Sequence, residues 1–452
     1  MRIELSIPQD FLDLLSATGG IFYGDIDNRF VKAITTDSRE CIKGDIFFAL
    51  DGNTKSGNNY ITDAINRGAI PVGRGVKRYG IRVDSANDAL LSFASFYKQA
   101  LPNLIHTTAI TGSVGKTTTK EFLKVLSNTR YKTHATWENY NNDIGASLTV
   151  LSADKDTEVL ILEFGMNHAG EIKKLSTSFA PNSAVITKIG SAHIGMLGTK
   201  EGIAKAKLEI ISGLKETLLI PKGEVLLSTN YPKKRFFSTK DISADIAIVR
   251  NSFDRLELYC KGDLVSIFDF PIRADHILEC LAASSIAACE LGLNPDEIVR
   301  GISMINNDSL RHKITKSSKG YTVIDDAYNA SYESVIAALD MLSKINGANK
   351  KYVLLGDILE LGDYSYDIHY SIGRIVPAFN IDYLLLIGEN SSAISEGAIS
   401  GGFDKERIFN LNNTVFPKET AEFIRGTLTL NDVILLKASH QMRLDKIIEL
   451  IR

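Results

Sequence analysis

The sequence predicts an α/β protein of three domains, two of which contain a parallel sheet. The chain has 452 residues, which is enough for two to four domains at roughly 100–200 residues each. Hydrophobic residues make up 44% of it and charged residues 23%, the balance of a soluble globular protein with several cores. Apolar runs alternate with helix-like segments in two separate parts of the chain, as in α/β proteins.

Residues 1–100 are expected to form a small N-terminal α/β domain. Short apolar runs alternate there with turn residues. The clearest example is a strand at 46–50, which lies between the breakers Gly44-Asp45 and Asp51-Gly52.

The central domain is predicted to span residues 101–308. Its apolar segment ending at Ala109-Ile110 runs into a glycine-containing loop, and the helical stretch Lys120 to Leu126 follows. Further strands are expected at 159–162, ending at Glu163, and at 184–187, shortly before His193. Because open α/β sheets bind ligands at the carboxyl ends of their strands, these polar residues mark a candidate site.

The C-terminal domain is predicted to span residues 309–452, with a second, Rossmann-like parallel sheet. Its expected strands are at 321–324, 352–355, 383–387 and 433–436. No G-x-G-x-x-G sequence follows any of them, so a nicotinamide or flavin dinucleotide is not expected.

Charge and cysteine content exclude several classes of function. Lys and Arg total 51 against 54 Asp and Glu, so the net charge of -3 supplies no broad cationic field for nucleic acid or an anionic membrane. No apolar run approaches 18 residues and no targeting sequence is recognised, so we expect no membrane insertion and a cytoplasmic location. The four cysteines form no C-x-x-C pair, and neither disulfides nor zinc are expected.

The glycine-containing loop at 111–119 predicts a phosphate site. Closely spaced glycines let backbone amides converge on phosphate oxygens, and the following helix adds its positive end. Lys116 would supply a mobile cation and Thr117 a magnesium ligand. The strict P-loop pattern has a glycine where this chain has Ile110, so the alternative is an ordinary turn with a solvated lysine. The strand before and the helix after favour a P-loop-type central sheet.

The shortened loop Thr-Gly-Ser-x-Gly-Lys-Thr resembles that of the Mur ligases and of folylpolyglutamate synthetases. Other segments extend the resemblance along nearly the whole chain and point to the Mur branch that adds D-alanyl-D-alanine to a UDP-linked muramoyl tripeptide. They lie at 36–50, 139–145, 163–172, 325–331 and 356–362.

The resemblance implies an enzyme that uses ATP and Mg²⁺. ATP would phosphorylate the terminal carboxylate of the UDP-linked muramoyl peptide, and the amine of the D-Ala-D-Ala dipeptide would attack the acyl phosphate. Because the phosphate loop and other nucleotide contacts lie in different domains, ATP is expected between domains that close over it. A monomer is expected, with no nucleic-acid partner.

Individual roles follow from the matched positions. The implied catalytic residues are Lys116, Lys207 and His193, with Lys207 carbamylated and Lys205 as the neighbour to exclude. The implied magnesium ligands are Thr117, Glu163, His193 and Lys207, and Glu163 also ends an apolar strand. The implied nucleotide contacts are Thr111, Gly112, Ser113, Val114, Gly115, Lys116, Thr117, Thr118, Arg311, Asp326, Tyr328 and Asn329. The implied substrate contacts are Ser38, Arg39, Asn139, Asn141 and Asn142.

This chain departs from the family pattern at four places. Gly195 replaces an acidic residue, Ile277 and Cys280 replace two asparagines, Ala438 and His440 replace a glycine and an arginine, and Ser56-Gly57-Asn58 replaces Asp-Gly-His. These departures leave two alternatives open. One is a Mur-like ligase for a different acid or amine, and the other is a non-catalytic nucleotide-binding partner.

Overall fold

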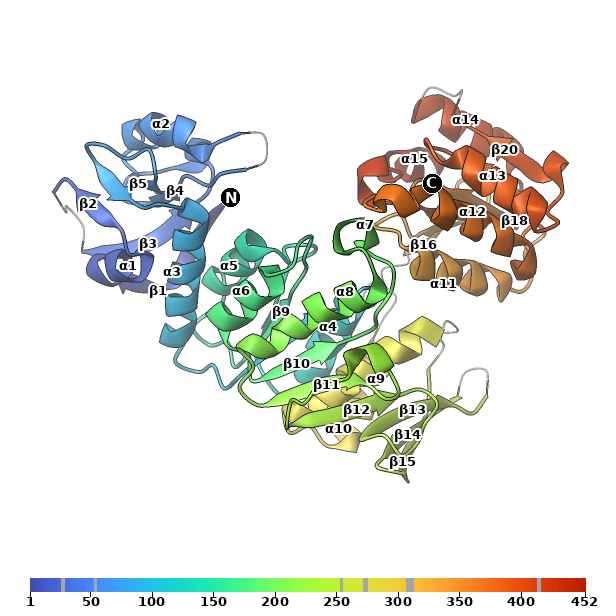
Figure 1. Cartoon of the computed structure of the whole chain (residues 1–452), viewed down its shortest axis with the longest axis horizontal. Helices are drawn as coiled ribbons and strands as arrows, with labels where there is room; N and C mark the ends of the chain where they lie inside the picture. The colour runs from blue at the N-terminus through green and yellow to red at the C-terminus, as the bar shows by residue number, and fades with distance from the viewer. Residues whose placement is uncertain (26–28, 53–54, 253–254, 271–274, 306–312, 413–415) are drawn as a thin grey trace.

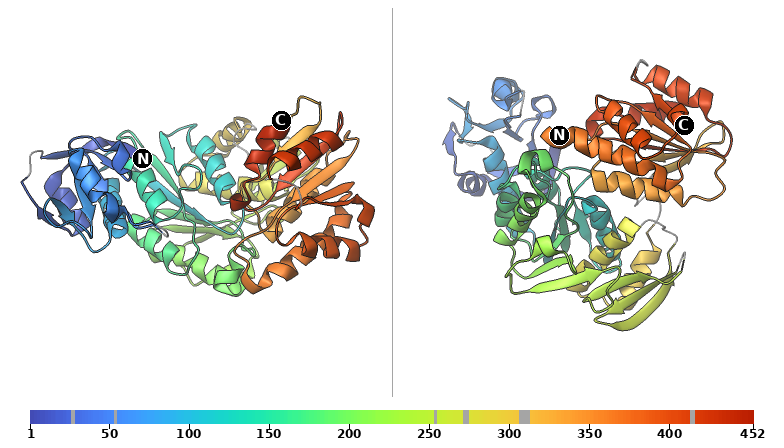
Figure 2. Two further views of the ribbon diagram at one scale, coloured as in Figure 1. Left: turned by 90° about the horizontal axis from the view of Figure 1, so that it is seen from above. Right: turned by 45° about the vertical axis from the view of Figure 1, so that its right-hand side comes forward.

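The computed structural model describes residues 1–25, 29–52, 55–252, 255–270, 275–305, 313–412 and 416–452. Within them, the strands form three sheets of six, nine and six strands. The first and the last sheet lie on opposite sides of the central one (Figure 1, Figure 2). The predicted fold class, α/β with a small N-terminal unit, a central P-loop-type sheet and a C-terminal Rossmann-like sheet, is confirmed.

The N-terminal sheet has the order β1-β3-β4-β5-β6-β2, with its four middle strands parallel. Its strands are β1 (Arg2–Asp10), β2 (Ile21–Tyr23), β3 (Phe30–Thr35), β4 (Ile46–Phe48), β5 (Ile70–Gly73) and β6 (Gly80–Arg82). Its helices are α1 (Phe11–Thr18), α2 (Ile61–Asn66) and α3 (Ala86–Ala100). The predicted strand at 46–50 is β4.

Helix α3 joins this unit to the central one. Its apolar face contributes Phe93 and Tyr97 to a hydrophobic cluster that continues into residues of the central unit such as Leu148. Lys98 Nζ donates to the carbonyl oxygen of Phe179 at 2.6 Å, and burial lowers the pKa of this lysine to about 8. The first two units therefore share one continuous core.

The central sheet has the order β15-β14-β13-β12-β11-β10-β7-β9-β8. It is parallel from β8 to β13 and ends in the antiparallel strands β14 and β15. Its strands are β7 (His106–Thr111), β8 (Thr133–Ala135), β9 (Val159–Glu163), β10 (Ser183–Ile186), β11 (Thr217–Pro221), β12 (Lys234–Ser238), β13 (Ile246–Arg250), β14 (Arg255–Cys260) and β15 (Asp263–Asp269).

Helices cover both faces of this sheet, as parallel sheets require. They are α4 (Lys116–Ser127), α5 (Asp143–Leu151), α6 (Glu171–Phe179), α7 (Ile194–Leu197), α8 (Lys200–Leu208), α9 (Asp275–Glu290) and α10 (Pro295–Ser303). Helices α5, α6 and α8 pack into the cluster shared with α3, whereas α4, α9 and α10 form a separate cluster on the other face. Strands β7 and β9 are thus buried on both sides.

The C-terminal sheet has the order β16-β17-β21-β18-β19-β20, and only β16 is antiparallel to its neighbour. Its strands are β16 (Lys313–Lys316), β17 (Thr322–Asp325), β18 (Lys351–Leu355), β19 (Tyr383–Leu386), β20 (Ile408–Asn410) and β21 (Val433–Lys437). Its helices are α11 (Tyr332–Ser343), α12 (Ser365–Ile375), α13 (Ser391–Ser400), α14 (Lys418–Thr427) and α15 (Asp445–Ile451). They lie in two clusters, one on each face.

The predicted strands correspond to β4, β7, β9, β10, β17, β18, β19 and β21. One helix differs, because α4 starts at Lys116 rather than Lys120. Gly115 adopts φ 87 at its N-cap, so the chain turns into the helix directly after the loop. None of the described helices is long and apolar enough to cross a membrane.

Candidate active site

The phosphate loop connects β7 to α4, and its shape depends on two glycines with positive φ. An alanine Cβ at Gly112 would lie 1.9 Å from Thr187 Oγ1, and one at Gly115 would lie 2.8 Å from Cys280 Sγ. The Thr187 hydroxyl donates to the Val114 carbonyl at 2.6 Å, which fixes the loop against the end of β10. Lys116 lies over the loop, with its ammonium 2.8 Å from the carbonyl oxygen of Gly112.

Glu163 lies at the carboxyl end of β9 beside this loop. Its side chain is 1% exposed, and each carboxylate oxygen accepts one hydrogen bond. Thr117 Oγ1 donates to Oε2 at 2.6 Å, and Asn141 Nδ2 donates to Oε1 at 3.0 Å. Thr117, Asn141 and Glu163 are predicted site residues from three chain segments, and they therefore contact one another at the Glu163 carboxylate.

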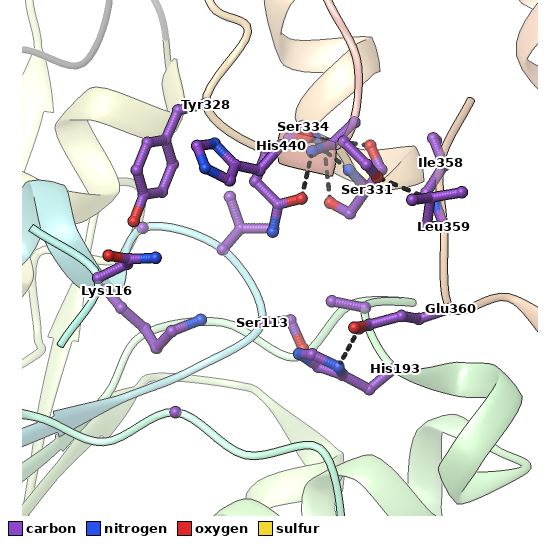
Figure 3. A pocket seen from close by; sticks show the side chains of 18 of the residues that line it. Ser113, Lys116, His193, Tyr328, Ser331, Ser334, Ile358, Leu359, Glu360 and His440 are labelled. Carbon is purple, nitrogen blue, oxygen red and sulfur yellow. Dashed lines mark hydrogen bonds and ion pairs between the residues drawn. The ribbon is translucent and has the colours of Figure 1, made fainter. Parts of the chain in front are cut away.

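A cavity of about 330 Å³ lies above the loop, between the central and C-terminal units. Figure 3 shows Lys116, Ser113 and His193 facing it from one side, and Tyr328 and His440 from the other. The predicted site residues that line it are Ser113, Val114, Gly115, Lys116, Thr118, Asn139, Asn141, Glu163, His193, Asp326, Tyr328 and Asn329. The tertiary structure thus brings the predicted nucleotide contacts of two units to one space.

On the C-terminal side, the lining is held by a buried ion pair. Lys437 Nζ lies 2.7 Å from Asp326 Oδ2, and it also donates to the carbonyl oxygen of Asn329 at 3.0 Å. This lysine, 2% exposed, ties the end of β21 to the turn after β17. Sequence reasoning assigned Lys437 no role, although its position after an apolar strand is the same signal that identified Glu163.

His193 is the N-cap of helix α7, with φ 67, and approaches the C-terminal unit. Its Nδ1 lies 2.8 Å from Glu360 Oε2, a short contact without the alignment of a good hydrogen bond (Figure 3). This polar contact lowers the pKa of the Glu360 carboxylate, despite partial burial. Glu360 also lines the cavity, and no role was predicted for it.

Lys207, on α8, is 2% exposed and is not among the residues that line the cavity. Burial, together with the nearby positive charge of Lys116, lowers its pKa well below that of an ordinary lysine. A lowered pKa favours the neutral amine, which is the form that reacts with CO₂.

Other predicted residues lie outside the cavity lining. Thr111 and Gly112 belong to the loop base, and Asn142 caps α5 by accepting from the Gly145 amide at 2.8 Å. Ser38 is buried in the N-terminal unit. Arg39 is 82% exposed and pairs with Asp37 at 2.6 Å, which lowers the pKa of Asp37 to about 2. Arg311 lies outside the described residues.

The chain's departures from the family pattern have visible packing consequences. Ile277 and Cys280 are 2% and 3% exposed and belong to the core between α4 and α9, so neither presents a polar group to the cavity. His440 does line it, with its ring 5.8 Å from that of Tyr328. Ala438 is fully buried under the turn at Gly356. In the N-terminal unit, Asn58 donates to Asp51 and accepts from the Gly75 amide.

The donor set fits Mg²⁺, which keeps several waters and takes few protein oxygens. A threonine hydroxyl and a carboxylate oxygen lie 2.6 Å apart beside the phosphate loop. Among the described residues, no three His, Cys, Asp or Glu side chains converge as a preformed metal cluster. The metal would therefore be held by Thr117 and Glu163 together with phosphate and water oxygens.

The loop geometry leads to a first expected result, for Gly115→Ala. Gly115 and Gly170 are both helix N-caps with positive φ, 87 and 92, but a Cβ at Gly170 meets nothing within 4 Å. Both changes strain the backbone, whereas only Gly115→Ala also displaces Cys280. We expect Gly115→Ala to weaken ATP binding at least about tenfold more than Gly170→Ala, measured by calorimetry. Adding Cys280→Ala should restore part of the loss, and equal affinities in the two glycine variants would contradict this account.

A phosphate loop that faces a second sheet across a cavity is typical of an enzyme that binds a nucleotide between two units of one chain. Comparisons with known proteins agree with this class. Residues 110–288 match the Mur ligase middle domain, and residues 310–440 match the Mur ligase, glutamate ligase domain. The chain therefore belongs to the Mur ligase family of ATP-dependent peptide ligases.

Full-length relatives specify the resemblance further. The UDP-N-acetylmuramoyl-tripeptide–D-alanyl-D-alanine ligase of Bacillus subtilis is 34% identical over 430 residues, covering 93% of each chain. The ligase of the same name from Synechocystis sp. is 31% identical, covering 92% of this chain and 91% of the relative. A crystal structure of MurF from Acinetobacter baumannii has a TM-score of 0.87 at 25% identity and covers 99% of each chain.

Proposed function

We propose that the protein joins D-alanyl-D-alanine to a UDP-N-acetylmuramoyl tripeptide, at the expense of ATP and through an acyl phosphate. The observation that carries the proposal is the cavity between the central and C-terminal units, where Lys116 and Glu163 face Asp326 and Tyr328. The likeness of the whole chain to relatives named for this reaction supports the choice of substrates.

The chain's own groups act mainly by positioning and by neutralising charge. The amides of residues 113–116 and the N-terminal end of α4 would bind phosphate oxygens. Lys116 would move from the Gly112 carbonyl to the transferred phosphoryl group, whose negative charge is a stronger partner than a neutral carbonyl. Residues 326–329, held by Lys437, would contact the nucleotide from the other side.

Thr117 and Glu163 would hold Mg²⁺, which supplies a Lewis acid that neutralises charge on the phosphates. Asn141 keeps the Glu163 carboxylate oriented through its 3.0 Å hydrogen bond. We assign His193 and a carbamylated Lys207 to the region around Thr117 and Glu163. His193 lines the cavity, and the positive charge of Lys116 lowers the pKa of the Lys207 amine.

Steady-state phosphate release tests the proposal. ATP hydrolysis is expected to require both the UDP-linked tripeptide and D-Ala-D-Ala, with one phosphate released per amide bond formed. If only another acid and amine stimulate release, the protein is a Mur-like ligase for those partners, a reading that His440 in the lining favours. If no acid and amine pair stimulates phosphate release, the remaining alternative is a non-catalytic nucleotide-binding partner.

Arg39→Ala is expected to raise the KM for the UDP-linked acid and to leave the KM for ATP nearly unchanged. Arg39 is exposed in the N-terminal unit and does not line the cavity beside the phosphate loop. Its guanidinium can therefore serve the UDP-sugar without touching ATP. Initial rates with each substrate varied in turn measure both constants, and a change in the ATP constant would show that the domain roles are wrong.

We further propose that residues 1–100, 101–308 and 309–452 act as separate domains that close over the substrates, and that the enzyme is a cytoplasmic monomer. The cavity lies between the central and C-terminal units, which supports closure of these two units as the step that completes the site.

A further inference from the structure

The loop at 189–195 is contacted from the C-terminal unit by two carboxylates, Glu333 and Glu360. This loop follows β10, and it carries His193 into the cavity. Glu333 lies in the first turn of α11, whereas Glu360 follows β18. Two separate segments of one unit thus hold the same short loop of another.

Glu333 binds the loop through several hydrogen bonds at once. The Ser191 amide donates to both of its carboxylate oxygens, at 2.9 and 3.0 Å, and the Ser191 hydroxyl donates to Oε2 at 2.9 Å. Ser191 is 4% exposed, so these bonds are shielded from water. Charge-assisted bonds of this kind are among the stronger polar contacts in proteins.

Glu360 holds the loop at its other end. Its carboxylate lies 2.8 Å from His193 Nδ1, and its backbone carbonyl accepts from the Gly195 amide at 3.3 Å. Between these contacts, Ile194 packs against hydrophobic clusters of both the central and the C-terminal sheet.

Two glycines make this approach sterically possible. A Cβ at Gly190 would lie 2.8 Å from Glu333 Oε2, and one at Gly195 would lie 2.6 Å from the backbone nitrogen of Gly362. At Gly195 the obstacle is backbone, which cannot move aside as a side-chain end can. Any larger residue there would separate the two units.

We propose that Glu333 and Glu360 form a two-point clamp on the 189–195 loop, which orients His193 and fixes the C-terminal unit over the phosphate loop. Both are positioning residues that act through Ser191 and His193. Where the family pattern has an acidic residue shortly after the histidine, this chain has Gly195. Glu360 supplies a carboxylate near His193 instead. The catalytic part of this inference rests on the proposed ligase function, whereas the clamp itself is a property of the fold.

Hydrogen exchange in the full-length protein without substrates tests the clamp. Glu333→Gln leaves one acceptor oxygen in place of two, so we expect exchange of the 189–195 amides to rise about tenfold or more. Glu406→Gln is the matched control, because Glu406 is an exposed carboxylate of the same unit. Equal exchange in the two variants would overturn the role of Glu333. Gly195→Ala should raise exchange further and increase the radius of gyration in solution scattering.

A double-mutant cycle tests whether Glu360 acts through His193. We expect Glu360→Gln to lower kcat/KM by about 10–100-fold in the natural chain and by less than about twofold in a His193→Ala background. A merely structural role would produce the same loss in both backgrounds, and that result would overturn the assignment. Unchanged melting temperatures exclude unfolding as the cause.

These measurements separate the clamp from the proposed function. If no acid and amine pair yields product, the ligase proposal fails, and exchange of the 189–195 amides in Glu333→Gln and Glu360→Gln still decides the clamp. If ligation is normal in the natural chain but neither variant alters exchange or kcat/KM relative to Glu406→Gln, the clamp fails and the ligase proposal stands.

Discussion

Replacing Lys116 with alanine is expected to lower the rate of ligation by at least about 10²–10³-fold while leaving the fold intact. Lys116 begins α4 directly after Gly115 of the phosphate loop, and its ammonium donates to the neutral carbonyl oxygen of Gly112 at 2.8 Å. That ammonium can therefore follow the charge that develops on the transferred phosphoryl group. Single-turnover formation of product, at saturating ATP, measures the loss in the chemical step.

Lys124→Ala is the control for this variant, since Lys124 lies on the same helix two turns farther along. It should keep near-normal activity. Circular dichroism and thermal melting check that both variants fold. Near-normal ligation by Lys116→Ala would remove the lysine from the chemistry and leave the loop as an ordinary turn.

Lys207→Ala is expected to cost at least about 100-fold in activity, because we propose that this lysine is carbamylated. A neutral amine adds CO₂ to form an N–C bond and loses a proton, which gives an anionic carbamate in place of the ammonium. The carbamate would supply an oxygen ligand to a second Mg²⁺. The buried position of Lys207 and the neighbouring charge of Lys116 both lower its pKa and so favour the reactive neutral amine. An uncompensated ammonium at this depth would be costly.

Lys205→Ala provides the matched comparison, since Lys205 is exposed on the same helix. It should behave like the natural protein. Electron density beyond the Lys207 amine in a nucleotide-bound crystal, or dependence of activity on dissolved bicarbonate, would support the carbamate. Partial rescue of Lys207→Ala by short carboxylic acids is expected, because they can supply the missing oxygens. An unmodified amine in an active crystal, together with an active alanine variant, would exclude Lys207.

Local patterns in the sequence were enough to predict the class of fold and the position of the phosphate loop. Strand β7 contains three threonines, so it was predicted from Ala109-Ile110 directly before the glycine loop. Strand β9 is buried on both faces and appears as a continuous apolar run, which is visible without any knowledge of its neighbours. The polar residue that ends such a run lies at the ligand-binding edge of the sheet, and Glu163 was found in this way. The family was identified from ordered motifs, and the comparisons confirm it.

The limits of that reasoning are visible at particular residues. Nothing in the sequence marks Glu333, because a glutamate in the first turn of a helix is ordinary, and its bonds to Ser191 depend on how two units dock. Glu360 lies in the motif at 356–362, but nothing in that motif indicates its contact with His193. Cys280 was read as a lost amide, whereas the structure shows its sulfur packed against the Gly115 turn.

The sequence by itself thus determined the α/β class, the strand-loop-helix around Lys116 and the set of residues expected near phosphate. The first two depend on interactions between residues close in the chain, which periodicity and turn chemistry record, whereas the set of residues came from the resemblance to the Mur ligases. Only the tertiary structure decided which groups meet across the cavity, how deeply Lys207 is buried and that Glu360 reaches His193. Such contacts join segments far apart in the chain, and they depend on the packing of whole units, for which no local pattern exists.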